Sequence, residues 1–154
     1  MRRLPANWRG RYDAVLNLYT SFGFFDNPSD DARVIAEFSR VLKPGGILVW
    51  QGASRDGVMS RFLSRDWWET RDGSMVAQER SFDSLSGVLT IHSTLRRKSG
   101  RTSRRRHRIR LYTATRIAEL CIERGLIVEE AYSGFTGKPL TRRSSEMLLV
   151  ARKR

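Results

Sequence analysis

Tyr12-Asp13-Ala14-Val15-Leu16-Asn17-Leu18 and Val41-Leu42-Lys43-Pro44-Gly45-Gly46-Ile47-Leu48-Val49-Trp50 are the two stretches that decide the fold of this chain. The first predicts a strand with near-continuous burial from its third residue, interrupted only at Asn17. In the second, the turn Lys43-Pro44-Gly45-Gly46 is typical of a helix end, because proline and glycine both interrupt helices. Residues 47–50 then predict a short buried strand.

A helix is predicted between these two strands. Asp26-Asn27-Pro28 has the composition of a helix start, with a capping side chain and a proline in the first turn. An apolar stripe follows at helical spacing: Val34, Ile35, Phe38, Val41 and Leu42. Strand, helix and strand in this order predict two parallel strands with a right-handed crossover. Such sheets bind ligands beyond the carboxyl ends of their strands, which here are residues 17–21 and 51–54.

The remainder of the chain predicts more strands and a second helix. Alternating or β-branched runs predict a three-stranded antiparallel meander over residues 75–82, 88–95 and 104–112. Residues 57–70 are expected to form a short helix and an aromatic-rich loop. Thr113 is expected to cap a helix that ends at Gly125 and turns Ile117, Leu120 and Cys121 inward. Two last strands are expected at 127–132 and 147–151, and no linker divides the chain, so residues 1–154 are expected to form one domain.

Charge is unevenly distributed along the chain. The 154 residues carry 29 Lys and Arg against 16 Asp and Glu, a formal net charge of +13. Nine of the basic residues and no acidic residue lie between Arg96 and Arg110. This basic stretch attracts anions, and nucleic acid is one candidate partner. A solvated hairpin and contact with an anionic acceptor are the alternatives.

Cysteine content and hydropathy exclude several classes of protein. A single cysteine, Cys121, excludes an intramolecular disulfide and cysteine-rich metal sites, and no metal site is expected. No apolar run approaches the roughly 20 residues of a membrane helix, so no membrane partner is expected. We expect a cytoplasmic protein.

Three segments resemble the class I S-adenosylmethionine-dependent methyltransferases. The stretch from Tyr12 to Gly23 resembles the fourth strand and following loop of that family. The turn Leu42-Lys43-Pro44-Gly45-Gly46 resembles the turn before its fifth strand, and residues 127–132 with 146–153 resemble its closing strand pair. The resemblance, which spans the whole chain, implies an α/β fold: a partial Rossmann-like sheet of parallel strands, a closing antiparallel pair and the inserted three-stranded meander.

One part of the family pattern is missing. None of the twelve glycines stands in the G-x-G arrangement of the cofactor loop, and Met1-Arg2-Arg3-Leu4-Pro5 resembles the stretch that follows the family's third strand. We therefore expect an N-terminally truncated domain that binds S-adenosyl-L-methionine weakly or not at all by itself. The strand at residues 14–18 would then be an apolar edge, through which the chain is expected to self-associate.

The resemblance and the sheet geometry together suggest site residues. The expected cofactor-binding residues follow the first strand: Asn17, Leu18, Tyr19 and Ser21. Trp67, Trp68 and Gln51 are expected to bind the acceptor, although core packing is an equal alternative for the two tryptophans. No catalytic residue is expected, because methyl displacement needs alignment rather than a nucleophile. His92 is interpreted as a strand residue, His107 as part of the basic face and Cys121 as a small buried hydrophobe.

The predicted function is methyl transfer from S-adenosylmethionine to an unidentified small-molecule acceptor, with inactivity of this chain alone left open. The alternative is a non-catalytic remnant that serves as a basic binding module for nucleic acid or for a protein partner.

Overall fold

The computed structural model describes residues 3–154, which divide into two compact units. The first unit contains the chain up to Ser60 together with Tyr112–Arg154, and the second unit is Arg61–Leu111. Met1 and Arg2, on which part of the family resemblance of residues 1–5 depends, lie outside the described residues. A division into two compact units does not decide whether they fold as one domain, so the assignment of residues 1–154 to a single domain stays a prediction.

The strand–helix–strand prediction is confirmed. β1 (Tyr12–Asn17) and β2 (Leu42–Ala53) are parallel, with Ala14 opposite Ile47 and Asn17 opposite Trp50. The connecting helix α1 (Pro28–Val41) begins where the sequence indicates, because the Asn27 side chain accepts a hydrogen bond from the Ser29 N–H at 2.9 Å. β2 starts earlier than predicted, since the chain already pairs with Tyr12 at Leu42, ahead of the glycine turn.

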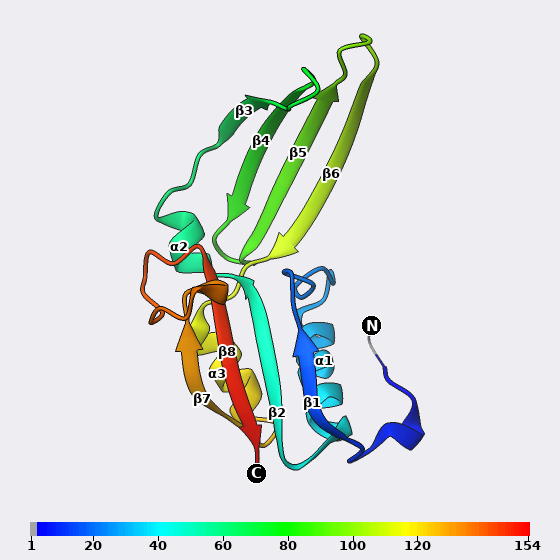
Figure 1. Cartoon of the computed structure of the whole chain (residues 1–154), viewed down its shortest axis with the longest axis vertical. Coiled ribbons are helices and arrows are strands. Elements are labelled where there is room, and N and C mark those ends of the chain that lie inside the picture. Colours follow the sequence, from blue (N-terminus) through cyan, green and yellow to red (C-terminus); the bar gives the residue numbers. More distant parts are fainter. Residues whose placement is uncertain (1–2) are drawn as a thin grey trace. The chain divides into compact units, whose positions relative to one another are not determined.

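The first unit is built around one mixed sheet with the strand order β1-β2-β8-β7. β7 (Leu126–Tyr132) and β8 (Glu146–Lys153) are antiparallel to each other, and β8 is also antiparallel to β2. Figure 1 shows these four strands side by side. This is the predicted arrangement of parallel strands with a closing antiparallel pair.

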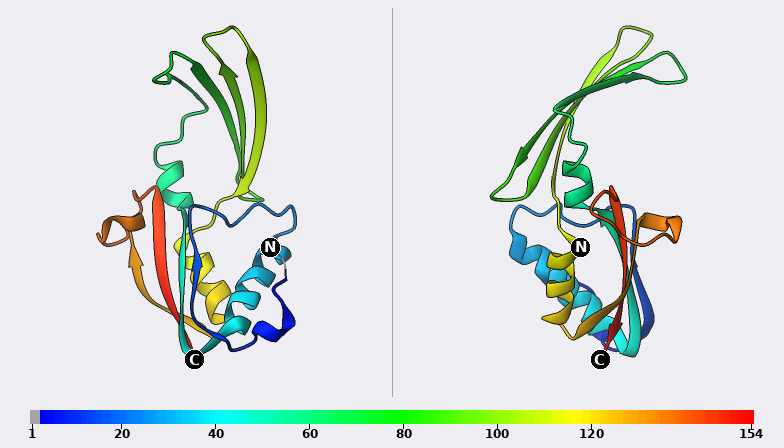
Figure 2. Two further views of the ribbon diagram at one scale, coloured as in Figure 1. Left: turned by 45° about the vertical axis from the view of Figure 1, so that its right-hand side comes forward. Right: turned by 90° about the vertical axis from the view of Figure 1, so that its left-hand side faces the viewer.

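Both long helices of the first unit cover the same face of this sheet (Figure 2, right). Helix α3 (Ala114–Ile122) is capped by Thr113, whose hydroxyl accepts from the Arg116 N–H at 3.1 Å. The shorter helical segments of this unit are η1 (Ala6–Trp8), α2 (Arg55–Met59) and η2 (Gly134–Thr136).

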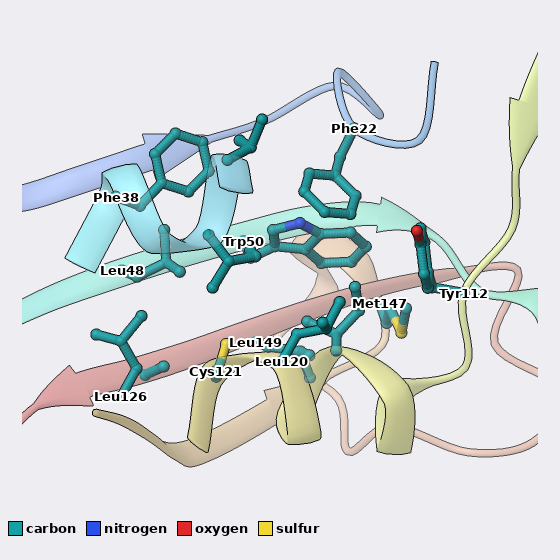
Figure 3. Packing of buried hydrophobic residues seen from close by; sticks show 14 of the residues in the cluster. Phe22, Phe38, Leu48, Trp50, Tyr112, Leu120, Cys121, Leu126, Met147 and Leu149 are labelled. Atoms are coloured by element: carbon teal, nitrogen blue, oxygen red, sulfur yellow. The ribbon is translucent and has the colours of Figure 1, made fainter. Parts of the chain in front are cut away.

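The core of the first unit lies between these two helices and the sheet (Figure 3). Ile35 from α1, Leu48 from β2 and Ile117 from α3 are each fully buried. Each such side chain contributes roughly 1.5–3 kcal/mol by leaving water. Cys121 is also in this cluster and is 1% exposed, which confirms its interpretation as a small buried hydrophobe. The core therefore fixes the sheet on which the candidate site is built.

The predicted burial of β1 is wrong. Leu16 is 63% exposed and Ala14 is also exposed, whereas Asn17, the expected interruption, is only 7% exposed. The reason is the pleat: Asn17 shares its face with Trp50 and the helices, and Leu16 points to the opposite face. The two long helices α1 and α3 both cover the Asn17 face, so Leu16 on the opposite face stays in contact with solvent.

The second unit is an antiparallel sheet of four strands rather than three. β4 (Met75–Asp83), β5 (Val88–Arg96) and β6 (Thr102–Arg110) are the predicted meander, and β3 (Arg65–Glu69) adds a fourth strand beside β4. The expected aromatic-rich loop is thus partly a strand. Its two neighbouring aromatic residues, Trp67 and Trp68, favour β structure, which the prediction overlooked.

The basic stretch places a row of arginines on the edge strand β6. Because successive side chains alternate between faces, Arg104, Arg106, Arg108 and Arg110 share one face, and His107 lies on the other face with Arg105. His107 therefore belongs to the basic strand, as predicted, but not to the face that carries the row of four arginines.

Candidate functional site

The candidate site lies at the carboxyl end of the parallel pair in the first unit. The chain leaves β1 in a sharp turn, with positive φ angles of 57° at Tyr19 and 53° at Thr20. Such a conformation is unusual for residues other than glycine, above all for β-branched threonine, and costs on the order of 1–3 kcal/mol per residue. Strained backbone of this kind is often concentrated where a protein binds its ligands.

Gln51 holds this turn in place. It is 2% exposed, and its Oε1 accepts a hydrogen bond from the Thr20 N–H at 3.3 Å. Its Nε2 donates to Glu146 Oε2 at 3.1 Å. A single buried amide thus connects the loop after β1 to the first residue of β8, across the carboxyl end of β2.

Asn17 and Ser21 form a second polar pair at the same end of β1. The Ser21 hydroxyl donates to Asn17 Oδ1 at 3.2 Å, and Asn17 Nδ2 is buried with no hydrogen-bond partner among the described residues. Both residues line a pocket of about 210 Å³ whose other walls are apolar. Those walls are Phe22, Phe24, Phe25, Val34 and Phe38. Leu18, which follows Asn17 in the chain, is half-buried.

Known proteins resemble this chain in sequence and in fold. No family model matches the chain. Over 95 residues, 56% of this chain, it is 30% identical to a glycine/sarcosine N-methyltransferase from Halorhodospira halochloris, of which it covers 35%.

Solved structures with the same arrangement cover nearly the whole chain. The CcbJ methyltransferase from Streptomyces caelestis superposes on 99% of it with a TM-score of 0.86 at 18% identity, and 61% of that protein is covered. The chain has the class I S-adenosylmethionine-dependent methyltransferase fold. CalS10 from Micromonospora echinaspora, an amino pentose methyltransferase solved with S-adenosylmethionine bound, matches 93% of this chain with a TM-score of 0.67 at 18% identity. The chain covers 58% of CalS10. It therefore spans about three fifths of the length of these two solved relatives.

The cofactor that this methyltransferase fold implies is S-adenosylmethionine, and the predicted cofactor-binding residues differ in how accessible they are. Tyr19 is 84% exposed at the carboxyl end of β1, where the side chain and the strained turn are accessible to a ligand. Asn17 and Ser21 instead bond each other, and Asn17 is buried. The assignment of Asn17, Leu18, Tyr19 and Ser21 to cofactor binding therefore stays a prediction.

The predicted acceptor residues fall in different units. Gln51 belongs to the first unit, whereas Trp67 and Trp68 stand on β3 of the second. The two tryptophans are 68% and 40% exposed, so the core-packing alternative is wrong for both. Their role toward an acceptor stays a prediction.

His92 and Cys121 are the other side chains considered for catalysis in the sequence. His92 is an exposed strand residue of β5. Burial raises the pKa of the Cys121 thiol to about 11, which suppresses the thiolate that would act as a nucleophile. The described residues contain no cluster of three or more His, Cys, Asp or Glu side chains that would hold a metal ion. Among residues 3–154, no helix is both long and apolar enough to cross a bilayer.

Two residues at this end of the methyltransferase sheet were not predicted as site residues. Glu146 accepts the hydrogen bond from Gln51, and Phe135 of η2 lies against Tyr19 with ring centroids 6.0 Å apart. Both come from the segment around the last turn, more than 80 residues after Gln51. The sequence offers one local signal for these two residues, which is that Glu146 stands at the start of an apolar strand. This signal does not indicate which residue bonds the glutamate.

Proposed function

We propose that this chain carries out S-adenosylmethionine-dependent methyl transfer to an amine nitrogen of a small molecule. The observation that carries the proposal is the hydrogen-bonded connection of Thr20, Gln51 and Glu146 across the carboxyl ends of β1, β2 and the start of β8. Ligands of open α/β sheets bind at this edge. The nitrogen acceptor is favoured by the similarity to a glycine/sarcosine N-methyltransferase.

The chemistry asks little of the protein beyond positioning. When bound, S-adenosylmethionine supplies an electrophilic methyl group, and an amine with a free electron pair attacks it directly. Holding two reactants in line contributes a large part of such a rate enhancement. The task of this chain is therefore to orient the acceptor beside Tyr19 and to exclude competing water. A basic side chain is needed only to remove a proton from the amine.

The test is transfer of a labelled methyl group from millimolar S-adenosylmethionine to a panel of small amines, alcohols and carboxylic acids. We expect label in the amines, at a rate that falls at least about tenfold in Tyr19→Ala, because a misplaced reactant loses much of the proximity effect. Leu85→Ala is the matched control, since Leu85 is fully exposed in the second unit. No label above that of heat-treated protein, or label in the alcohols alone, would overturn the proposal.

Cofactor affinity is proposed to be low for this chain. The described residues offer Tyr19 and the turn at Thr20, and no G-x-G loop occurs in the sequence. We expect a dissociation constant for S-adenosylhomocysteine in the high micromolar to millimolar range. Calorimetric binding in the low micromolar range would contradict this part of the proposal.

Self-association through β1 is a further part of the proposal. Among the described strands, β2 is the one neighbour of β1, so the outer edge of β1 offers unpaired backbone groups. Leu16 adds an exposed apolar side chain to that edge.

A second candidate function is binding of nucleic acid by the second unit. It is favoured by the four arginines on one face of β6, at alternate positions about 6.8 Å apart. Arginines in such a row contact phosphates without reading sequence. Binding of single-stranded RNA should then weaken steeply with salt, and RNA binding that is absent at low salt would exclude this function.

A further inference from the structure

Two aromatic rings stand exposed next to each other at the candidate site. Tyr19 is 84% exposed and Phe135 is 56% exposed, and their ring planes are inclined by 44° at a centroid separation of 6.0 Å. Both residues belong to the first unit. Contiguous exposed apolar surface often marks a binding site.

The Glu146 carboxylate is held by the buried amide of Gln51, which also bonds the turn that carries Tyr19. Gln51 bonds the Thr20 N–H with one end and Glu146 Oε2 with the other. The backbone of Gly134 also packs on this carboxylate: a Cβ added to Gly134 would stand 3.0 Å from Glu146 Oε2. Thr20 follows Tyr19 in the chain and Gly134 precedes Phe135. The Glu146 carboxylate is therefore connected through Gln51 to Thr20, and it packs against Gly134; these two residues are the chain neighbours of the aromatic residues.

This group of Tyr19, Phe135 and Glu146, positioned by Gln51, is called the aromatic–carboxylate cluster. Aromatic faces attract cations that lie within about 6 Å of the ring centroid. The second oxygen of the carboxylate is available to a positively charged donor, since an ionised carboxylate accepts about four hydrogen bonds. The chain has a formal net charge of +13, so this carboxylate supplies negative charge in a protein whose overall charge is positive.

We propose that the aromatic–carboxylate cluster binds an alkylated ammonium group, either the partly methylated acceptor or the methylated product. The proposal rests on the proposed transfer of methyl groups to amine nitrogen. Alkylation spreads the positive charge over an apolar surface, which suits aromatic faces better than it suits water. Glu146 then supplies the charge complement, and Gln51 is a positioning residue that holds the carboxylate and the Tyr19 turn in register.

The experiment uses tetramethylammonium chloride as the probe, with the full chain, no cofactor and sodium chloride to keep the ionic strength constant. Backbone amide shifts of ¹⁵N-labelled protein should change in a saturable way at residues 19–20, 134–136 and 146. Glu146→Gln and Phe135→Leu should each weaken the apparent affinity about fivefold, the upper range for a cation–aromatic contact or an ion pair at an exposed site.

Matched variants separate binding from folding. Phe135→Tyr, which keeps an aromatic face, should retain the affinity. Ile122→Ala removes another exposed apolar side chain and Glu130→Gln another exposed carboxylate of the first unit, and neither should change it. Shifts that do not saturate, that lie elsewhere, or that are unaltered in Glu146→Gln and Phe135→Leu would overturn the proposal.

The two proposals fail in different ways. If tetramethylammonium binds at the cluster but no amine is methylated, the proposed function is lost and the cation site stands. If amines are methylated and the probe does not bind, the cation site is lost and the proposed function stands.

Discussion

The sheet of the first unit and the sheet of the second unit have four strands each, but they are stabilised differently. Within residues 3–154, every helix belongs to the first unit, and two of them pack on one face of its sheet. Trp50 on β2 is consequently 3% exposed, whereas Trp67 on β3 is 68% exposed. The same residue type in the same kind of element is core in one sheet and surface in the other. Burial is thus decided by what covers a face.

Removal of each tryptophan gives the largest expected contrast. Trp50→Ala should lower the free energy of unfolding by about 3–5 kcal/mol, because it leaves a cavity between β2 and the helices. Trp67→Ala should change it by less than about 0.5 kcal/mol, as for other exposed side chains. Urea denaturation followed by circular dichroism measures both. Equal losses would contradict the distinction between the two sheets.

The buried thiol on α3 gives the next largest effect, and it depends on pH. The folded pKa of Cys121 is raised to about 11 by burial, from an ordinary value of 9.0. Between pH 9 and 11 the unfolded state therefore binds fewer protons than the folded state, so the thiol's contribution to stability falls as pH rises, by about 1.4 kcal/mol per pH unit.

The measurement compares the natural chain with Cys121→Ala. The difference in unfolding free energy between the two should shrink by up to about 2.7 kcal/mol from pH 8.5 to pH 11. At pH 8 the native thiol should also react about 100-fold more slowly with a disulfide reagent than an unfolded thiol does. A pH-independent difference, or a thiol that reacts at the unfolded rate, would show that the α3 face of the core is open.

The smallest expected effect on stability is at the uncovered face of the first sheet. Leu16→Lys should leave the unfolding free energy within about 0.5 kcal/mol of its original value, since Leu16 is 63% exposed. The added charge on an edge strand should reduce self-association, which light scattering would detect. A natural chain that is monomeric at all concentrations would contradict the proposed role of this edge.

Much of the fold could be predicted because its signals are local. The caps at Asn27 and Thr113 act within a few residues, and the structure has a helix start at both. Helix α1 ends at Val41, just before the predicted glycine turn, but the turn residues themselves lie within β2, with Gly45 at a positive φ. The burial of β1 could not be predicted in the same way. Whether Leu16 or Asn17 faces the core depends on which side of the sheet the helices occupy, and that is not a local property.

The candidate site was predictable only where it adjoins a strand end. Gln51 and Tyr19 follow predicted strands, so the topology alone indicated their edge of the sheet. Glu146 and Phe135 reach the same place through the segment between β7 and β8, and only the three-dimensional structure brings them to Gln51 and Tyr19. The four-stranded form of the second sheet was missed because β3 is short and ends at a turn held by side chains.

The most direct test of the account is where S-adenosylhomocysteine perturbs the amide spectrum of the ¹⁵N-labelled chain. The account predicts concentration-dependent shifts centred on residues 17–21 and 51–54, even if the affinity is low. Shifts centred on residues 43–46 at the opposite end of β2, shifts confined to the second unit, or no shift at millimolar ligand would contradict it.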